Sequence, residues 1–271
     1  MRVGIVGGGS IARLFLDHIA KGELGDARVI AILGREHSAS CTALCAAFQV
    51  PFMHDVDALI DAKPDVVVEA AAHAWVESHA EKILAAGISL IVLSCGAMAD
   101  DALRGRMEAA ARASGAQLYV PSGGIGALDA IKAAVVAGVD EVTIRTAKPP
   151  RAWKNIDYVE RLGVDLDALT APCILYEGPA RAGVKHFPQN VNIAAVLSMA
   201  GIGFDRTRLV VVAEPGLERN THVITAKGVS GEISITLRNV PSPENPKTAW
   251  LACYSALAAM KQMQSPIRYG T

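Results

Sequence analysis

Residues 1–20, MRVGIVGGGSIARLFLDHIA, carry the strongest structural signal in the chain. The apolar run Arg2–Val6 predicts a buried strand, and this run stops at three consecutive glycines. Apolar residues then recur at helical spacing from Ile11 to Ile19, which predicts a helix with one buried face. A strand, a glycine-rich turn and a helix in this order are typical of the first βαβ unit of a dinucleotide-binding domain.

The turn itself has the pattern G-x-G-x-x-A over residues 7–12. Gly7 would permit a tight turn, and Gly9 would let the backbone approach a pyrophosphate without a Cβ clash. The backbone N–H groups at the start of the helix, at Ser10 and Ile11, would then meet the phosphates. We therefore predict that Gly7, Gly9, Ser10 and Ile11 bind a dinucleotide, with a ligand-free tight turn as the alternative.

The rest of the first half alternates short apolar runs with helical patterns. The predicted strands cover residues 28–33, 65–69, 89–93 and 117–120, and the predicted helices cover residues 38–48, 77–86 and 100–114. Strands that are apolar on both faces suit a parallel sheet covered by helices. The sequence therefore predicts an α/β fold, with a doubly wound Rossmann domain over residues 1–122.

The pattern changes in the second half, where we predict a smaller α+β domain over residues 123–245. A helix at 128–136, a strand at 141–147 and a helix at 193–200 are followed by an antiparallel meander from Thr207. Residues 232–238 alternate between apolar and polar side chains, which is typical of a half-buried strand. The last segment, 246–271, has a stripe from Trp250 to Met260 that predicts a helix packed back on the first domain.

Composition excludes several classes of protein. Hydrophobic residues make up 51% of the 271 residues, which excludes a disordered chain. The net charge of −1 and the lack of a basic stripe speak against a nucleic-acid partner. The first predicted strand begins at Arg2, so we expect no signal peptide, and the apolar residues 83–99 are too short and interrupted to span a membrane.

Cysteine usage predicts a cytoplasmic protein with reduced thiols, because five cysteines is an odd number in a chain without export signals. Cys41 and Cys45 stand four residues apart on a predicted helix. No second pair of ligands lies nearby in the sequence, so packing explains these thiols better than metal binding does. We predict no metal site.

The end of the second strand bears on the choice of cofactor. It reads Leu33-Gly34-Arg35-Glu36, without an acid at the place where NAD-binding domains bind the adenosine ribose. Arg35 could pair with a 2′-phosphate and favour NADP, or it could be a solvated surface side chain. Glu36 could still reach the ribose. The prediction is therefore NAD or NADP, with Arg35 as a binding residue.

Small residues follow the third, fourth and fifth strands, where a nicotinamide ring would lie against the backbone. We predict cofactor contacts at Ala70, Ala71, Ser94, Cys95 and Gly124. Small residues are also common at strand ends in general, and that is the alternative interpretation.

The candidates for acid–base and substrate-binding roles lie in the second half. His222 follows a polar turn and shares a strand face with Asn220, although a histidine on such a face is more often a hydrogen-bonded core residue. Asn190 and Asn192 precede an apolar helix, where they could cap it or donate to a ligand. Lys148, followed by two prolines, is a candidate cation for a carboxylate substrate.

Taken in order, these segments resemble the L-aspartate dehydrogenase family over nearly the whole chain. The resemblance is carried by the G-x-G-x-x-A loop, SGGIGALD at 122–129, KPP at 148–150, FPQNVN at 187–192, Asn220-x-His222 and NPKT at 245–248. It implies NAD- or NADP-dependent oxidation of L-aspartate to iminoaspartate, which hydrolyses to oxaloacetate and ammonia and in some organisms supplies NAD biosynthesis. It also implies a homodimer, with the second domain serving substrate binding and dimerisation.

The resemblance assigns roles to individual residues. It makes His222 the active-site histidine and puts dinucleotide contacts near Gly124 and on Asn190 or Asn192. We predict that Lys148, Asn192 and Asn220 bind the substrate while His222 manages the proton and water chemistry of amine release. The alternatives are a reductase similar to dihydrodipicolinate reductase or homoserine dehydrogenase, and a dinucleotide-binding sensor without turnover.

Overall fold

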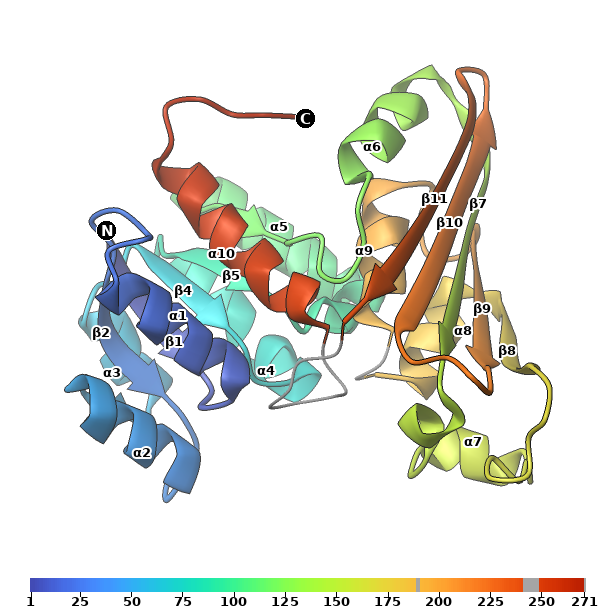
Figure 1. Ribbon diagram of the computed structural model, residues 1–271. Coiled ribbons are helices and arrows are strands. Elements are labelled where there is room, and N and C mark those ends of the chain that lie inside the picture. The colour runs from blue at the N-terminus through green and yellow to red at the C-terminus, as the bar shows by residue number, and fades with distance from the viewer. Residues whose placement is uncertain (189–190, 241–248, 271) are drawn as a thin grey trace. The chain divides into compact units, whose positions relative to one another are not determined.

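The computed structural model describes residues 1–188, 191–240 and 249–270 (Figure 1). The chain forms two compact units, and each is described by itself below. Unit 1 comprises Met1–Pro121 and Cys253–Ile267, and unit 2 comprises Ser122–Ala252 and Arg268–Thr271. Asn190 and the NPKT segment at 245–248 lie outside the described residues.

Unit 1 contains a six-stranded sheet with the strand order β3-β2-β1-β4-β5-β6. Its strands are β1 (Arg2–Val6), β2 (Arg28–Leu33), β3 (Phe52–Met53), β4 (Val66–Glu69), β5 (Ser89–Val92) and β6 (Leu118–Tyr119). All the neighbouring strands pair in parallel. The order reverses next to β1, so the glycine-rich turn after β1 lies at the switch point where such sheets bind ligands. The predicted doubly wound fold is confirmed.

The helices of unit 1 follow the strands in alternation. They are α1 (Ser10–Ala20), α2 (Ala39–Phe48), α3 (Val56–Asp61), α4 (His73–Ala85) and α5 (Asp101–Ser114). The prediction was wrong about the start of α4, which begins at His73 rather than Glu77, because Val76 is the one buried residue of its first turn and no apolar periodicity shows there. The short elements β3 and α3 carry too few residues to show a period and were not predicted.

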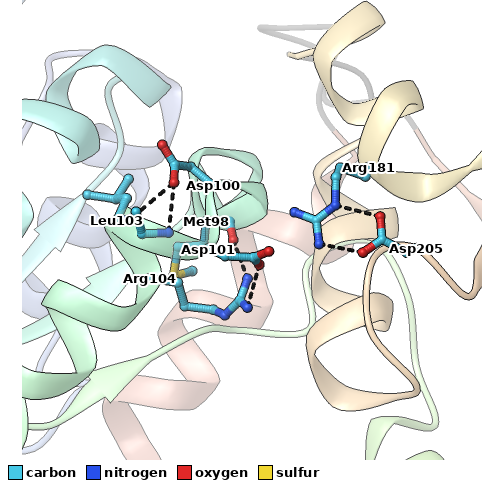
Figure 2. Close-up of polar contacts among 8 residues, drawn as sticks. Met98, Asp100, Asp101, Leu103, Arg104, Arg181 and Asp205 are labelled. Carbon is cyan, nitrogen blue, oxygen red and sulfur yellow. Dashed lines mark hydrogen bonds and ion pairs between the residues drawn. The ribbon is translucent and has the colours of Figure 1, made fainter.

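Side chains fix the start of α5 and the loop before it. The Asp100 carboxylate accepts hydrogen bonds from the backbone N–H groups of Ala102 and Leu103, at 2.8 and 3.2 Å, which caps the helix (Figure 2). The Arg104 guanidinium donates to the carbonyl of Met98, at 2.8 Å, and pairs with Asp101. This anchors the short 3-10 helix Cys95–Ala99, which continues the chain after β5.

Helix α10 (Trp250–Gln264) packs into the hydrophobic core of unit 1. Its Ala256, Leu257 and Met260 are buried in the same cluster as strand residues such as Ile5 and helix residues such as Phe15. Cys41 and Cys45 are buried in this cluster too. Trp250 departs from the predicted stripe, because it is 43% exposed at the start of the helix.

Unit 2 contains a five-stranded mixed sheet with the strand order β11-β10-β7-β9-β8. Its strands are β7 (Val139–Lys148), β8 (Cys173–Pro179), β9 (Thr207–Ala213), β10 (Asn220–Gly228) and β11 (Gly231–Asn239). The hairpin of β10 and β11 is antiparallel, as predicted (Figure 1). The predicted meander from Thr207 is wrong, however, because β9 pairs in parallel with β7, and β7 separates it from β10.

The helices of unit 2 are α6 (Leu128–Ala137), α7 (Asp157–Arg161), α8 (Ala180–His186) and α9 (Asn192–Ala200). Most residues of α9 are buried. The residue before α9 is Val191, and no side chain caps the helix within the described residues, so Asn192 is the first helical residue rather than a cap. The bidentate ion pair of Arg181 with Asp205 joins the start of α8 to the loop before β9 (Figure 2).

Candidate active site

The glycine-rich turn of unit 1 has the geometry that a phosphate cradle needs. Gly7 has a φ of 101°, in the left-handed region that favours glycine, and its N–H donates to the carbonyl of Leu33 at 2.8 Å. A Cβ at Gly7 would lie only 2.4 Å from the carbonyl oxygen of Ala70. A Cβ at Gly9, in contrast, would meet nothing within 4 Å. Gly9 therefore has open space beside it, in agreement with a backbone that a ligand approaches.

The first turn of α1 can accept an anion. Gly9 is the N-cap and offers no side-chain oxygen, and no acidic residue stands in the first turn. The N–H groups of the first turn therefore have no side-chain cap within the described chain, and they carry the positive end of the helix dipole. These features fit the pyrophosphate of a dinucleotide, which Gly7, Gly9, Ser10 and Ile11 would hold.

The loop after β2 lies at the same edge of the sheet as the glycine-rich turn. Arg35 is exposed, and the Glu36 side chain is 71% exposed. A Cβ at Gly8 would lie 2.7 Å from the backbone nitrogen of Cys41 and 2.9 Å from Oγ of Ser40, so the start of α2 lies close to the glycine turn. Arg35 and Glu36 are thus the exposed charged candidates at this place for contact with an adenosine ribose or its 2′-phosphate.

Glu69 ends β4 as a fully buried carboxylate, which the sequence analysis did not single out. Its Oε1 accepts from the N–H of Ala71, and its Oε2 accepts from the N–H of Leu93, at 2.8 and 3.1 Å. The N–H and the hydroxyl of Ser94 donate to the same carboxylate at 2.8 and 2.9 Å. Burial raises the pKa of Glu69, and these hydrogen bonds oppose that shift.

Glu69 thus ties together the two loops in which Ala70, Ala71, Ser94 and Cys95 were predicted to meet the nicotinamide. Cys95 is itself buried, and burial together with the Glu69 carboxylate raises the pKa of its thiol to about 12. The thiol is therefore protonated at physiological pH and is a small packing group rather than a nucleophile.

One end of the unit 2 sheet gathers polar side chains on a face that is otherwise apolar. We call this group the polar end of the sheet; its members are Thr146, Lys148, Asn220, His222 and Asn239. Register explains the grouping, because His222 on β10 pairs with Thr146 on β7, and Asn220 pairs with Asn239 on β11. Side chains two residues apart share a face, so Lys148 joins Thr146, and Asn220 joins His222. All five residues are buried.

His222 is 3% exposed, and its Nδ1 lies 2.8 Å from Oγ1 of Thr146. Burial, followed by the nearby Lys148 cation, lowers the pKa of His222 to about 3. Its imidazole is therefore neutral throughout the physiological range.

Lys148 is 5% exposed at the end of β7, with Nζ 5.0 Å from the centroid of the Trp153 ring. This cation–π contact favours the charged form. Burial acts in the opposite direction and lowers the pKa of Lys148 to about 8. Trp153 is fixed in turn by its indole N–H, which donates to the carbonyl of Val212 at 3.0 Å.

Asn239 connects the polar end to the loop that contains Gly124. Its side-chain amide donates to the Gly124 carbonyl at 2.6 Å. A Cβ at Gly124 would lie 3.1 Å from that amide nitrogen, which explains why glycine suits this position. Asn192, the first residue of α9, is half-buried.

The chain is similar over its full length to L-aspartate dehydrogenases of other organisms. It is 38% identical to the L-aspartate dehydrogenase of Methanosarcina barkeri over 272 residues, covering 100% of both chains. It is 42% identical to L-aspartate dehydrogenase 2 of Bordetella pertussis, covering 96% of each. The chain belongs to the L-aspartate dehydrogenase family.

Further comparisons agree with this membership. The family model described as "Aspartate dehydrogenase, C-terminal" matches residues 129–263, and "Homoserine dehydrogenase, NAD binding domain" matches residues 7–121. Among solved structures, the aspartate dehydrogenase of Thermotoga maritima has a TM-score of 0.75 at 26% identity, covering 100% of this chain and 99% of that one. The predicted family, the predicted class of NAD(P)-dependent amino-acid dehydrogenase and the predicted cofactor, NAD or NADP, are confirmed.

The chain thus presents two groups of candidate site residues, one in each unit. Unit 1 brings together the glycine turn, Arg35 and the two loops joined by Glu69. Unit 2 brings together His222, Lys148 and Asn220 at the polar end, with Gly124 attached through Asn239. Within the described residues, no three His, Cys, Asp or Glu side chains gather as metal ligands. No helix in the described ranges is long and apolar enough to span a membrane.

Sequence analysis missed Glu69, Thr146, Trp153 and Asn239. Thr146 precedes Lys148 by two residues, so the alternation of strand residues offered a signal for it. The sequence offered no signal for Glu69 and Asn239, because their hydrogen bonds join distant parts of the chain.

Proposed function

We propose that this chain catalyses the NAD(P)-dependent oxidative deamination of L-aspartate. The proposed reaction removes a hydride from the α-carbon and a proton from the amine to give iminoaspartate. Water then adds to the imine carbon, and ammonia leaves to give oxaloacetate. The observation that carries the proposal is the pair of Lys148 and His222, buried on one sheet face in a member of this family.

Lys148 is the proposed partner of a substrate carboxylate. With a pKa of about 8 it is mostly protonated at pH 7, so its ammonium group can meet the negative charge. Burial makes that attraction stronger than it would be in water. The amides of Asn220 and Asn192 are proposed to donate hydrogen bonds to the same substrate.

His222 is the proposed catalytic residue. Its Nδ1 is occupied by Thr146, and Nε2 is the ring atom left to face a reacting group. From Nε2 the imidazole can hold the substrate or the attacking water in place during amine release.

Unit 1 is proposed to hold the dinucleotide, which supplies the hydride acceptor when bound. Gly7, Gly9, Ser10 and Ile11 would bind the pyrophosphate. Arg35 would meet the adenosine end, and Ala70, Ala71, Ser94 and Cys95 would border the nicotinamide. Gly124 and Asn190 are proposed as further cofactor contacts on the strength of the family resemblance.

The experiment is an absorbance assay of nicotinamide reduction by the purified chain at alkaline pH. L-Aspartate, L-glutamate and L-homoserine are each supplied with NAD or with NADP. A rise with L-aspartate alone is the expected result. A rise with L-homoserine instead would reassign the substrate, and dinucleotide binding without any turnover would favour a sensor.

We also propose, from the family resemblance, that the chain assembles as a homodimer and works in the cytoplasm. Light scattering of the purified protein tests the first proposal, because a dimer has twice the mass of the chain. A supply of iminoaspartate for NAD biosynthesis stays a prediction that a growth assay of a deletion strain would check.

A further inference from the structure

Thr146 makes the one side-chain hydrogen bond to His222 among the described residues. Its Oγ1 lies 2.8 Å from Nδ1, and the two residues are direct partners in the pairing of β7 with β10. Thr146 is completely buried, and His222 is 3% exposed. Water therefore has little access to this hydrogen bond.

The direction of the hydrogen bond follows from what each atom needs. A buried hydroxyl has one hydrogen, and leaving that hydrogen without an acceptor is costly. Within the described chain, Nδ1 of His222 is the one side-chain acceptor that Thr146 Oγ1 reaches. If Nδ1 carried a proton, Nδ1–H would donate to Thr146 Oγ1, and the hydroxyl hydrogen would then lack a side-chain acceptor. Thr146 therefore donates, and Nδ1 accepts.

A neutral imidazole carries one proton, so a ring that accepts at Nδ1 carries that proton on Nε2. We propose that Thr146 is a positioning residue that holds His222 in the tautomer with its proton on Nε2, so that His222 meets the substrate as a hydrogen-bond donor. This inference rests on the proposed function and adds a direction to the role of His222.

The surroundings keep both partners in place. Ladder pairing joins β7 and β10 on either side of the two residues, from Thr221–Ala147 to Lys227–Glu141. Threonine is branched at Cβ, so its side chain has few rotamers to choose from. Burial, followed by the Lys148 cation, disfavours a second proton on the ring.

The donor role has a chemical consequence. An Nε2–H group can bind a substrate carboxylate, or the hydroxyl oxygen that forms when water adds to the imine carbon. In this tautomer Nε2 has no lone pair in the ring plane with which to take the first proton from the substrate amine. His222 then acts by binding and orienting, and the amine proton leaves by another route.

The direct test is ¹⁵N NMR at pH 7 on the wild-type protein, in which the histidines are labelled with ¹⁵N. The His222 signals are identified by their loss in the His222→Gln variant. The expected result is an unprotonated Nδ1 and a protonated Nε2. A protonated Nδ1 would overturn the inference, and this readout needs no turnover and no Thr146 variant.

Kinetics of matched variants provide the second test. Thr146→Val keeps the shape of the side chain but removes the hydroxyl. We expect kcat for L-aspartate to fall about tenfold or more, which is the size of effect seen for residues that orient a metal-bound histidine. Thr146→Ser should restore most of the rate, while the cofactor Kd stays unchanged. Thr143→Val, on the same strand but on the other face, is the control and should keep the wild-type rate.

The outcomes separate the inference from the proposed function. A wild-type kcat in a folded Thr146→Val protein would overturn the positioning role while leaving the aspartate assignment intact. Absence of L-aspartate turnover in the wild type would remove the proposed function, whereas the NMR spectrum would still report the tautomer.

Discussion

Glu69 and Ser94 are joined by two hydrogen bonds, one from the Ser94 N–H and one from its hydroxyl, at 2.8 and 2.9 Å. The pair connects the end of β4 to the loop that follows β5. The same carboxylate accepts the N–H of Ala71, so both loops take their shape from one buried side chain. A preformed backbone at this edge lets a flat ring bind without ordering the loops first.

Replacement of Glu69 by Gln should therefore weaken both folding and cofactor binding. The amide NH₂ of glutamine would replace a carboxylate oxygen that accepts from N–H donors. Each buried donor left without an acceptor costs about 1–3 kcal/mol. We expect urea denaturation to show a loss of about 2–3 kcal/mol and titration to show weaker dinucleotide binding. Glu36→Gln, in the exposed loop after β2, is the matched control for stability alone and should change it by about 0.5 kcal/mol or less. Equal stabilities of the two variants would contradict the role of Glu69.

Replacement of His222 by Ala should abolish most turnover and leave cofactor binding intact. The imidazole belongs to unit 2, while the glycine turn that would hold the pyrophosphate belongs to unit 1. Loss of a group that orients the reacting atoms costs about 10²-fold in rate. Steady-state kinetics and dinucleotide titration on the same preparation measure both effects. Loss of binding together with activity would instead indicate a structural role for His222.

Arg35→Ala should distinguish the two cofactors. If the guanidinium pairs with a 2′-phosphate, the Kd for NADP rises about tenfold, which corresponds to about 1.4 kcal/mol, and the Kd for NAD stays the same. Arg28, exposed at the start of β2, offers a control substitution of the same kind. An equal change for both cofactors would place Arg35 away from the 2′ position.

Lys148 should make dicarboxylate binding depend on pH. Burial lowers its pKa to about 8, so its charge is present below that pH and is lost as the pH rises through it. Succinate has no amine to titrate and is fully ionised in this range, and His222 stays neutral. The inhibition constant of succinate should rise about tenfold per pH unit above pH 8, because only enzyme with a protonated Lys148 binds succinate.

Lys148→Arg is the control for this experiment, since a guanidinium stays charged up to pH 10. If the variant binds succinate, its inhibition constant should be flat with pH. A wild-type inhibition constant that is flat between pH 7 and 10 would show that Lys148 does not meet the carboxylate.

The sequence predicted the Rossmann domain because its signals are local. A strand, glycines and an amphipathic helix stand next to one another in residues 1–20, and β1 and α1 appear where their periods indicate. The sheet of unit 2 was harder, because its order depends on which strands meet. The parallel pairing of β9 with β7 joins residues that are far apart in sequence, and no periodicity encodes it.

The same reasoning separates the predicted from the missed site residues. Lys148 and His222 were found because their residue types and neighbours suggest chemistry. Thr146 and Glu69 were missed because their roles come from the partners that tertiary pairing provides. Arg35 was predicted from its position after a strand.

The most direct measurement of the central claim follows the α-hydrogen of the substrate. The wild-type chain is incubated with L-aspartate deuterated at the α-carbon and with NAD or NADP, and the reduced cofactor is analysed by mass spectrometry. We predict one deuterium in the reduced nicotinamide and release of ammonia in equal amount. Failure to form reduced cofactor, or reduced cofactor without deuterium, would contradict the assignment of this chain as an L-aspartate dehydrogenase.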